Sequence, residues 1–242
     1  MDRYRFFAAS VRAGVVELPD DQAHHALHVL RLQTGVEVEV FDGKGNWGRG
    51  ILETTKRAAG VDVKRVESTP PPADRLTLAT AVPKADRAEW LVEQASQLNA
   101  SAVQWISADR GVVKPREGGG KMEKFQKLAI ESAKQCGRNW VLEMGEPRPV
   151  AEVVAAAVGR GETVWWLEPR EGVELAGEVS RVRAGGLAMR ITALIGPEGG
   201  WSQQEMEMLA ATAGVIRVRL TPTILRIETA CAAVAAVVGV FA

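Results

Sequence analysis

The chain contains, at residues 194–202, the sequence Leu-Ile-Gly-Pro-Glu-Gly-Gly-Trp-Ser, and at residues 220–230 the sequence Leu-Thr-Pro-Thr-Ile-Leu-Arg-Ile-Glu-Thr-Ala. Each stretch begins as the end of an apolar strand, passes through a turn rich in glycine or proline, and enters a segment with the composition of a helix. Open α/β sheets bind ligands where such turns follow the carboxyl ends of neighbouring strands. The two stretches therefore predict a crevice lined by backbone N–H and C=O groups.

Around these turns, residues 73–242 alternate between apolar and amphipathic segments. The pattern predicts strands at 76–82, 102–106, 163–167, 191–195 and 215–218, and helices at 84–98, 121–136, 202–211 and 230–241. Ser202 begins a Ser-x-x-Glu sequence, which is typical of a capping box at a helix start. Alternating strands and helices predict a mostly parallel sheet with helices on both faces.

The first 72 residues have a different pattern. Residues 36–41 alternate with a period of two, Asp42-Gly43 is a hairpin signal, and 47–53 and 61–66 are further strand candidates. One helix is expected between Asp20 and Leu32, with Asp20 or Asp21 as its N-cap. Three consecutive prolines at 70–72 predict a linker. We therefore expect a small β-barrel domain at 1–72 and an α/β domain at 73–242.

Composition limits the class of protein. Of 242 residues, 46% are apolar and 25% charged, as in ordinary globular proteins, and the formal net charge of zero gives no sign of a nucleic-acid partner. Cys136 and Cys231 form no disulfide framework, and no signal peptide is visible. The apolar run 229–242 is shorter than the roughly 20 residues that span a bilayer. We expect a cytoplasmic protein without a membrane segment.

Two glycine-rich stretches resemble nucleotide motifs. Residues 43–48 match G-x-G-x-x-G, but a strand-like segment follows where a dinucleotide site needs a helix, so a glycine-rich hairpin is favoured. The turn at 196–200 lacks the Lys-Ser/Thr ending of a P-loop, which disfavours a triphosphate. Glu198 either lies in the crevice or is a carboxylate favoured by the helix dipole.

Histidines and basic residues give weaker signals. His24 and His28 have helical spacing but no credible third ligand, so no metal is expected; together with Arg31 they could face a phosphate, or the helix could be merely structural. Residues 109–138 hold eight Lys/Arg against four acids, which is either a solvated helix face or a polyanion footprint.

The second turn carries Arg226 and Glu228 just before an alanine-rich helix. They are either a structural ion pair or site residues, and Glu228 or Thr229 could cap the helix. That helix is apolar nearly all round, which suits a core or a subunit interface.

These motifs together resemble the RsmE family, the uridine-N3 methyltransferases of small-subunit ribosomal RNA, which belong to the SPOUT class. The resemblance runs nearly end to end. It rests on the segments 24–32, 83–87 and 129–138 and on both turns described above. The chain departs from the family at Thr221, where Gly is usual, at Thr223, where Arg is frequent, and at Ile227, where Thr is frequent; Trp201 replaces a common Phe.

The resemblance implies a SPOUT-type fold with a C-terminal trefoil knot, a PUA-like N-terminal domain that binds RNA, a homodimer, and S-adenosyl-L-methionine as cofactor. The substrate implied is 16S ribosomal RNA or the small ribosomal subunit. The implied cofactor contacts are Leu167, Glu168, Ile195, Gly196, Pro197, Gly200, Leu220, Thr221, Pro222, Thr223, Ile224 and Leu225. The implied RNA contacts are Arg3, Arg5, His25, Arg31, Lys84, Arg110 and Arg138.

Methylation of uracil N3 requires removal of a weakly acidic proton, so a base or a stabiliser of the uracil anion is needed. We expect Arg226 to stabilise the anion or anchor a phosphate, and Glu228 and Glu198 to orient groups or act as bases. Two alternatives stay open. One is a SPOUT methyltransferase that modifies another RNA position. The other is a non-catalytic RNA-binding ribosome assembly factor, which the substitutions at 221, 223 and 227 would permit.

Overall fold

The computed structural model describes residues 4–56, 58–84, 86–112, 120–186 and 188–240. The chain divides into two units. Met1–Pro71 and Ile130–Val141 form what we call the N-terminal unit, and Pro72–Ala129 and Leu142–Ala242 form the C-terminal unit. Helix α3 (Gly120–Cys136) contributes residues to both units.

The N-terminal unit is built on a five-stranded sheet in the order β1-β3-β4-β5-β2. Its strands are β1 (Arg5–Phe7), β2 (Gly14–Glu17), β3 (Glu37–Phe41), β4 (Asn46–Thr54) and β5 (Ala59–Ser68). Among the described strand pairs of this sheet, β1 and β3 are parallel and the other three pairs are antiparallel. Alternate side chains of these strands, among them Phe6, Val40 and Leu52, form a buried core. Burial of that apolar face is the main stabilising contribution to the unit.

The glycine-rich stretch at 43–48 is a hairpin, as the sequence predicts. It joins β3 to β4, with φ of 71° at Gly43 and 97° at Gly45, a backbone region that favours glycine. The Asp42 carboxylate accepts hydrogen bonds from the backbone N–H of Lys44 at 2.8 Å and of Asn46 at 3.1 Å. The motif therefore serves a tight turn.

The helix expected at 20–32 is shorter than predicted. It consists of α1 (Asp20–His24) followed by one π-helical turn, η1 (His25–Val29). The N-cap position is Pro19, so the expectation that Asp20 or Asp21 caps it is wrong; both lie in the first turn, where the helix dipole favours carboxylates. The element ends before Arg31, whose φ of 54° is left-handed.

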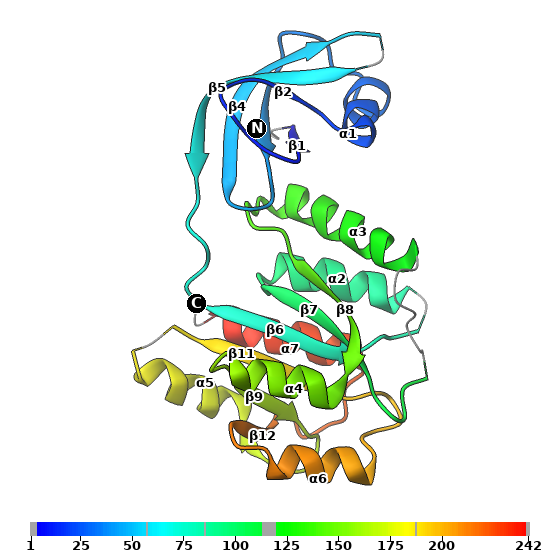
Figure 1. Cartoon of the computed structure of the whole chain (residues 1–242), viewed down its shortest axis with the longest axis vertical. Helices are drawn as coiled ribbons and strands as arrows, with labels where there is room; N and C mark the ends of the chain where they lie inside the picture. The colour runs from blue at the N-terminus through cyan, green and yellow to red at the C-terminus, as the bar shows by residue number, and fades with distance from the viewer. Residues whose placement is uncertain (1–3, 57, 85, 113–119, 187, 241–242) are drawn as a thin grey trace. The chain divides into compact units, whose positions relative to one another are not determined.

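The C-terminal unit contains a seven-stranded sheet in the order β10-β12-β9-β11-β6-β7-β8, and every pair in it is parallel. The strands are β6 (Arg75–Ala81), β7 (Ala102–Ser107), β8 (Glu143–Pro149), β9 (Thr163–Leu167), β10 (Val173–Glu174), β11 (Arg190–Ile195) and β12 (Val215–Arg219). The helices are α2 (Arg87–Gln97), α4 (Val150–Gly159), α5 (Leu175–Ala184), α6 (Gln203–Ala211) and α7 (Ile227–Val240). Figure 1 shows α2 and α7 behind this sheet and α4 in front of it. The mostly parallel α/β fold predicted from the sequence is confirmed.

In two respects the structure of this unit differs from the sequence predictions. Helix α7 begins at Ile227, so Glu228 and Thr229 lie inside its first turn and the expectation that either one caps it is wrong. The sequence also did not predict β8 or α4; β8 is a polar edge strand containing two prolines, which edge positions tolerate. In the described part of the chain, no helix has the length and apolarity needed to cross a membrane.

Candidate active site

Three loops leave the same edge of the sheet in the C-terminal unit. Strand β9 lies between β11 and β12, with Leu194 opposite Trp166 and Val218 opposite Leu167. The backbone N–H of Glu168 donates to the Val218 carbonyl at 2.9 Å, which holds the first loop beside the end of β12. The predicted cofactor residues at 167–168, 195–200 and 220–225 therefore follow the carboxyl ends of adjacent parallel strands, where α/β sheets bind ligands.

The loop after β11 is a tight turn from Pro197 to Gly200. Gly200 donates to the Pro197 carbonyl at 2.9 Å and has a left-handed φ of 71°. Gly196 has a different role, since a Cβ there would lie 2.7 Å from the indole of Trp201, which is only 6% exposed. Glycine at position 196 therefore leaves the space that the Trp201 indole occupies, and its role is not limited to contact with a ligand.

The start of α6 fixes this turn to the loop after β7. The capping box is confirmed, because Ser202 and Glu205 exchange side-chain and backbone hydrogen bonds. The Ser202 hydroxyl also donates to Asp109 at 2.5 Å, and the Asp109 N–H donates to Glu205 at 3.0 Å. As a result Arg110 lies against Gly199, where a Cβ would be 3.1 Å from the Arg110 carbonyl.

The loop after β12 is held by a hydrogen bond that the usual glycine could not make. The Thr221 hydroxyl donates to the Thr223 carbonyl at 2.7 Å. The loop leaves Ile224 73% exposed, an unusual state for a large aliphatic side chain, and Pro222 and Thr223 are exposed as well. The departure at Thr221 therefore stabilises a turn, and the exposed Ile224 side chain gives the same loop an apolar surface.

Arg87 brings the two predicted carboxylates together. Its guanidinium lies 3.0 Å from Glu198 Oε1 and 3.7 Å from Glu228 Oε1. Glu228 is 8% exposed, and its Oε2 has no hydrogen-bond partner in the described part of the chain. Partly exposed ion pairs such as Arg87–Glu198 contribute about 1 kcal/mol or less, so we assign Arg87 to positioning. In the sequence, Arg87 is the last residue of the 83–87 motif, and it is not among the predicted site residues.

A small hollow of about 10 Å³ lies beside these carboxylates. It is bordered by Lys84, Val112, Pro197, Glu198 and Ile227, among others. The space holds at most one water molecule. The structure thus brings the predicted RNA contact Lys84 to the predicted catalytic residue Glu198.

Arg226, by contrast, is exposed, and no hydrogen bond or ion pair of its side chain is found among the described residues. Arg226 directly precedes α7, and Ile227 is the one residue between Arg226 and Glu228 in the sequence. A free guanidinium at this position is available to an anionic group.

The remaining predicted RNA contacts differ in exposure. Arg31, Lys84 and Arg110 are exposed and His25 is half-buried, whereas Arg3 lies outside the described residues. Arg5 is 7% exposed; it pairs with Glu39 at 2.9 Å and donates to the Ala133 carbonyl at 2.9 Å. Arg138 is half-buried, and burial lowers its pKa. These contacts hold the Arg5 side chain in the interior of the N-terminal unit, so it does not lie on a surface that RNA could contact.

The histidine pair stands apart from this site. The rings of His24 and His28 are 4.9 Å apart. Over the ranges that the structure describes, no three His, Cys, Asp or Glu side chains are grouped as a metal site would require.

One prediction concerns Cys231 in the first turns of α7. Full burial raises the pKa of its thiol to about 12, although a hydrogen bond with Thr80 acts in the opposite direction. At pH 8 only about one thiol in ten thousand is ionised, and the thiolate is the reactive form. We expect a thiol reagent to modify only the half-exposed Cys136 in the native protein and both cysteines in denaturant. Loss of native labelling in Cys136→Ser is the control, and two reactive native thiols would contradict the assignment.

Comparison with known families identifies two domain models along the chain. An RNA methyltransferase domain model matches residues 69–239, and an RNA methyltransferase PUA domain model matches residues 18–62. The first covers the whole sheet of the C-terminal unit, and the second covers α1, η1, β3 and β4 and the first residues of β5.

Individual relatives give the same result over most of the chain. Ribosomal RNA small subunit methyltransferase E from Mycobacterium bovis is 30% identical over 94% of this chain and 87% of its own length. The corresponding protein from Synechocystis is 29% identical over 94% of this chain and 74% of its own length. The crystal structure of the Neisseria gonorrhoeae enzyme, bound to S-adenosyl methionine, is 26% identical, has a TM-score of 0.82 and covers 97% of this chain and 96% of that one. The chain therefore belongs to the ribosomal RNA small subunit methyltransferase E (RsmE) family.

Proposed function

We propose that the protein transfers a methyl group from S-adenosyl-L-methionine to N3 of a uridine in 16S ribosomal RNA. Membership of the RsmE family supports the reaction class and the small-subunit RNA as substrate. The observation that carries the proposal is the meeting of two carboxylates on Arg87 beside the three loops. Such a group of charges is suited to moving a proton next to a bound cofactor.

The three loops carry groups that suit the proposed cofactor. The apolar surface of Ile224, 73% exposed, suits an adenine ring, and the half-buried Glu168 carboxylate can accept hydrogen bonds from ribose hydroxyls. The residues that would hold the cofactor are those of the three loops, at 167–168, 195–200 and 220–225. When bound, the cofactor supplies an electrophilic methyl group.

The chain's own residues would handle the proton and the charge. The unpartnered Oε2 of Glu228 would accept the uracil N3 proton, and the N3 electron pair would form the new bond to the methyl carbon, whose bond to sulfur would break. Arg226 stabilises the negative charge that develops on the uracil oxygens. Glu198 holds Arg87, which in turn fixes Glu228. Because pairing hides N3, the target uridine must be unpaired or flipped out.

The decisive experiment is mass mapping of modified 16S ribosomal RNA from a strain that lacks the protein, with calorimetric titration of the purified protein by S-adenosylmethionine. Loss of one methyl-uridine together with cofactor binding supports the proposal. A missing methyl group at another atom or in another RNA favours the other methyltransferase. Intact modification without cofactor binding favours the assembly factor.

The exposed predicted cations give a testable RNA footprint. Arg31 and Lys84 have no ion-pair partner in the described part of the chain, so Arg31→Ala and Lys84→Ala should leave the fold intact. Each should lower the slope of log affinity against log salt concentration by about 0.7–0.9 for one lost phosphate contact. The control is Lys64→Ala on an exposed strand position. Equal slopes in all four proteins would place the contacts elsewhere.

We also propose a homodimer formed through α7. One face of this helix, with Thr229, Ala232, Ala233, Ala236 and Val237, is not fully buried within the chain, while the opposite face packs inside it. A two-fold interface uses the same patch on both copies. Ala236→Arg should produce a folded monomer with little transferase activity, whereas Ala210→Arg on exposed α6 should stay dimeric. Sedimentation and a methyl-transfer assay on the same samples test this, and a fully active monomeric wild type would refute it.

The same proposal includes a cytoplasmic location, a PUA-like RNA-binding domain at 1–72, a methyltransferase domain at 73–242, and a C-terminal trefoil knot. The match of the PUA model to residues 18–62 and the start of the methyltransferase model at residue 69 support this division.

A further inference from the structure

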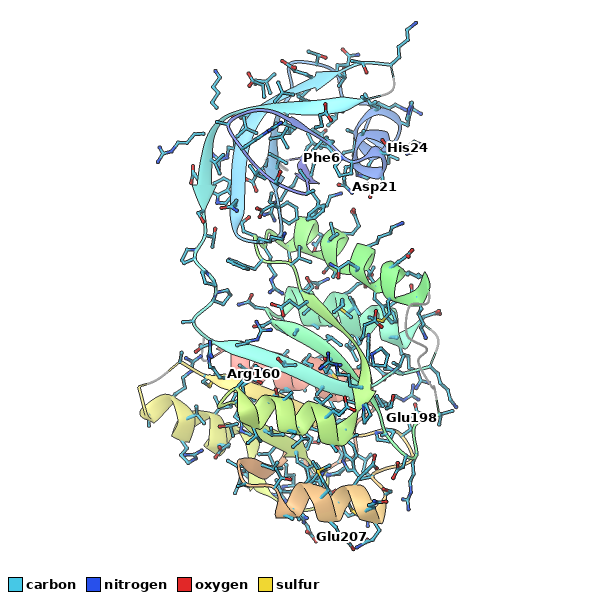
Figure 2. All side chains as sticks on the ribbon, viewed as in Figure 1. Phe6, Asp21, His24, Arg160, Glu198 and Glu207 are labelled. Carbon is cyan, nitrogen blue, oxygen red and sulfur yellow. The ribbon has the colours of Figure 1, made fainter. Side chains whose placement is uncertain are left out.

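The sheet of the N-terminal unit has an outer face that carries exposed cations. Its other face covers the buried core, where Figure 2 shows Phe6 on the side of α1. Arg49 on β4 and Arg65 on β5 lie on the outer face, and both side chains are exposed. Trp47, two residues before Arg49 on the same strand, is half-buried on that face. We call these three residues the β4–β5 patch.

Arg49 and Arg65 are direct neighbours across two antiparallel strands, because the register places them opposite each other. Side chains at such positions have Cβ atoms about 4.5–5.5 Å apart, and like charges there destabilise a sheet. A β-bulge follows Arg49, and its extra residue, Lys64, has no partner opposite it on β4. The sheet therefore contains a repulsive pair, and an anion beside the two guanidinium groups would relieve that repulsion.

Glu39 neutralises this pair only in part. It lies opposite Arg49 on β3, but its carboxylate is 2.9 Å from the Arg5 guanidinium and 3.8 Å from that of Arg49. Arg65 has no hydrogen-bond or ion-pair partner among the residues that the structure describes. Across β1, β3, β4 and β5, the row of opposite residues is therefore Arg5, Glu39, Arg49 and Arg65, with three positive charges and one negative charge.

The row is buried at β1 and exposed at β4. The Arg5 side chain is 7% exposed, lies over the Phe41 ring at 4.0 Å and donates to the Ala133 carbonyl. The Arg49 side chain is 45% exposed, and its guanidinium lies over the Trp47 ring, 5.6 Å from the centroid. This cation–π contact supports the Arg49 guanidinium from one side. The exposed part of the guanidinium is available to a flat ligand.

These groups match the chemistry of single-stranded RNA. Unpaired bases stack on aromatic side chains and on guanidinium planes, and arginine pairs with phosphate oxygens. Arg49, supported by Trp47, suits a base, and Arg65 on the adjacent strand suits the adjoining phosphate. Glu67 lies opposite Trp47, so Arg49, Arg65 and Glu67 together have one net positive charge, which equals the single negative charge of a phosphodiester.

We propose that the β4–β5 patch binds single-stranded RNA, with a base stacked on Arg49 and a phosphate held by Arg65. The inference rests on the proposed RNA substrate and adds a contact surface to the predicted contacts Arg31 and Lys84. The patch contains no residue of the three loops, so it binds RNA without taking part in methyl transfer.

The test measures binding of a short single-stranded oligouridine by fluorescence anisotropy over a range of salt concentrations. Arg65→Ala should lower the slope of log affinity against log salt concentration by about 0.7, for one lost phosphate contact. Arg49→Lys keeps the charge but loses the planar group. Its slope should stay unchanged while its affinity falls about 5- to 150-fold, the usual loss for one stacked base.

Two matched controls accompany these variants. Arg65→Lys should keep the wild-type slope, because lysine also binds phosphate as a point charge. Arg12→Ala removes an exposed arginine of the same unit outside its strands and should change neither slope nor affinity. The melting temperature of Arg65→Ala should not fall, since the substitution removes a repulsive pair.

A wild-type slope in Arg65→Ala, or wild-type affinity in Arg49→Lys, would overturn the proposal. Inorganic polyphosphate has no bases, so an equal loss of polyphosphate and oligouridine affinity in Arg49→Lys would also overturn the stacked base. Titration of each protein with S-adenosylmethionine separates this inference from the proposed function. A wild type that binds the cofactor but no oligouridine refutes the patch alone, whereas a wild type that binds neither also contradicts the proposed methyl transfer.

Discussion

Gly196→Val is expected to lower the affinity for S-adenosylmethionine by at least about a hundredfold, or about 2.8 kcal/mol. The structure gives the reason: a Cβ at this position would lie 2.7 Å from the indole of Trp201, and two further methyl groups must displace that ring or the turn from Pro197 to Gly200. Either movement changes the shape of the loop after β11 while the sheet keeps its pairing. Calorimetry on the folded variant, with far-ultraviolet circular dichroism to show that the fold is retained, measures the effect.

Gly177→Val in α5 is the matched control, because a Cβ there meets no atom of the described residues within 4 Å. Its cofactor affinity should equal that of the wild type, and valine has a somewhat higher helix propensity than the glycine it replaces. Wild-type affinity in Gly196→Val would remove the assignment of the cofactor to these loops.

Arg226→Ala is expected to slow methyl transfer by about 100- to 1,000-fold, the usual loss when one preorganised donor to a developing anion is removed. Because the Arg226 side chain is exposed and has no partner in the described residues, the free energy of unfolding should change by no more than about 0.5 kcal/mol. Cofactor affinity and dimerisation should also be retained. Single-turnover measurements with saturating cofactor isolate the chemical step.

Two further variants show how Arg226 contributes to methyl transfer. Arg226→Lys keeps the charge but loses the planar fork, so partial activity indicates electrostatic stabilisation and full loss indicates two-bond recognition. Arg170→Ala removes another exposed arginine of the same unit and should turn over normally. Normal turnover in Arg226→Ala would exclude it from catalysis.

The fold could be predicted where local pattern determines structure. Strand β9 has the bounds expected from its apolar run, and the capping box at Ser202 starts α6 as predicted. The first unit's β1 and β2 were missed because three or four residues carry too little periodicity. The polar edge strand β8 was missed because its prolines suggest a loop.

The site could be predicted only in part, because sequence does not show which charges are already paired. Arg5 looks like a free cation in the sequence, yet Glu39 and the Ala133 carbonyl occupy its guanidinium. Arg87 looks like an ordinary helix residue, yet it contacts Glu198, 111 residues away. The homodimer and the knot remain predictions of the family resemblance.

The pairing of β6 with β11 at the middle of the sheet has a consequence for how the chain folds. The first residues of the two strands, Arg75 and Arg190, are 115 positions apart in the sequence and lie opposite each other. Just before them, the Met189 N–H donates a hydrogen bond to the Asp74 carboxylate. In chain order, β6 is the first strand of its sheet. Bringing the ends of so long a chain segment together costs conformational entropy before native contacts can compensate for it. Parallel sheets with such non-local pairing therefore nucleate slowly. During refolding, β6, β7 and β8 can therefore pair before β11 is available, and the β6 side of this three-stranded fragment is then an open apolar edge. Aggregation should compete with refolding at this stage, and raised protein concentration should lower the yield of active enzyme.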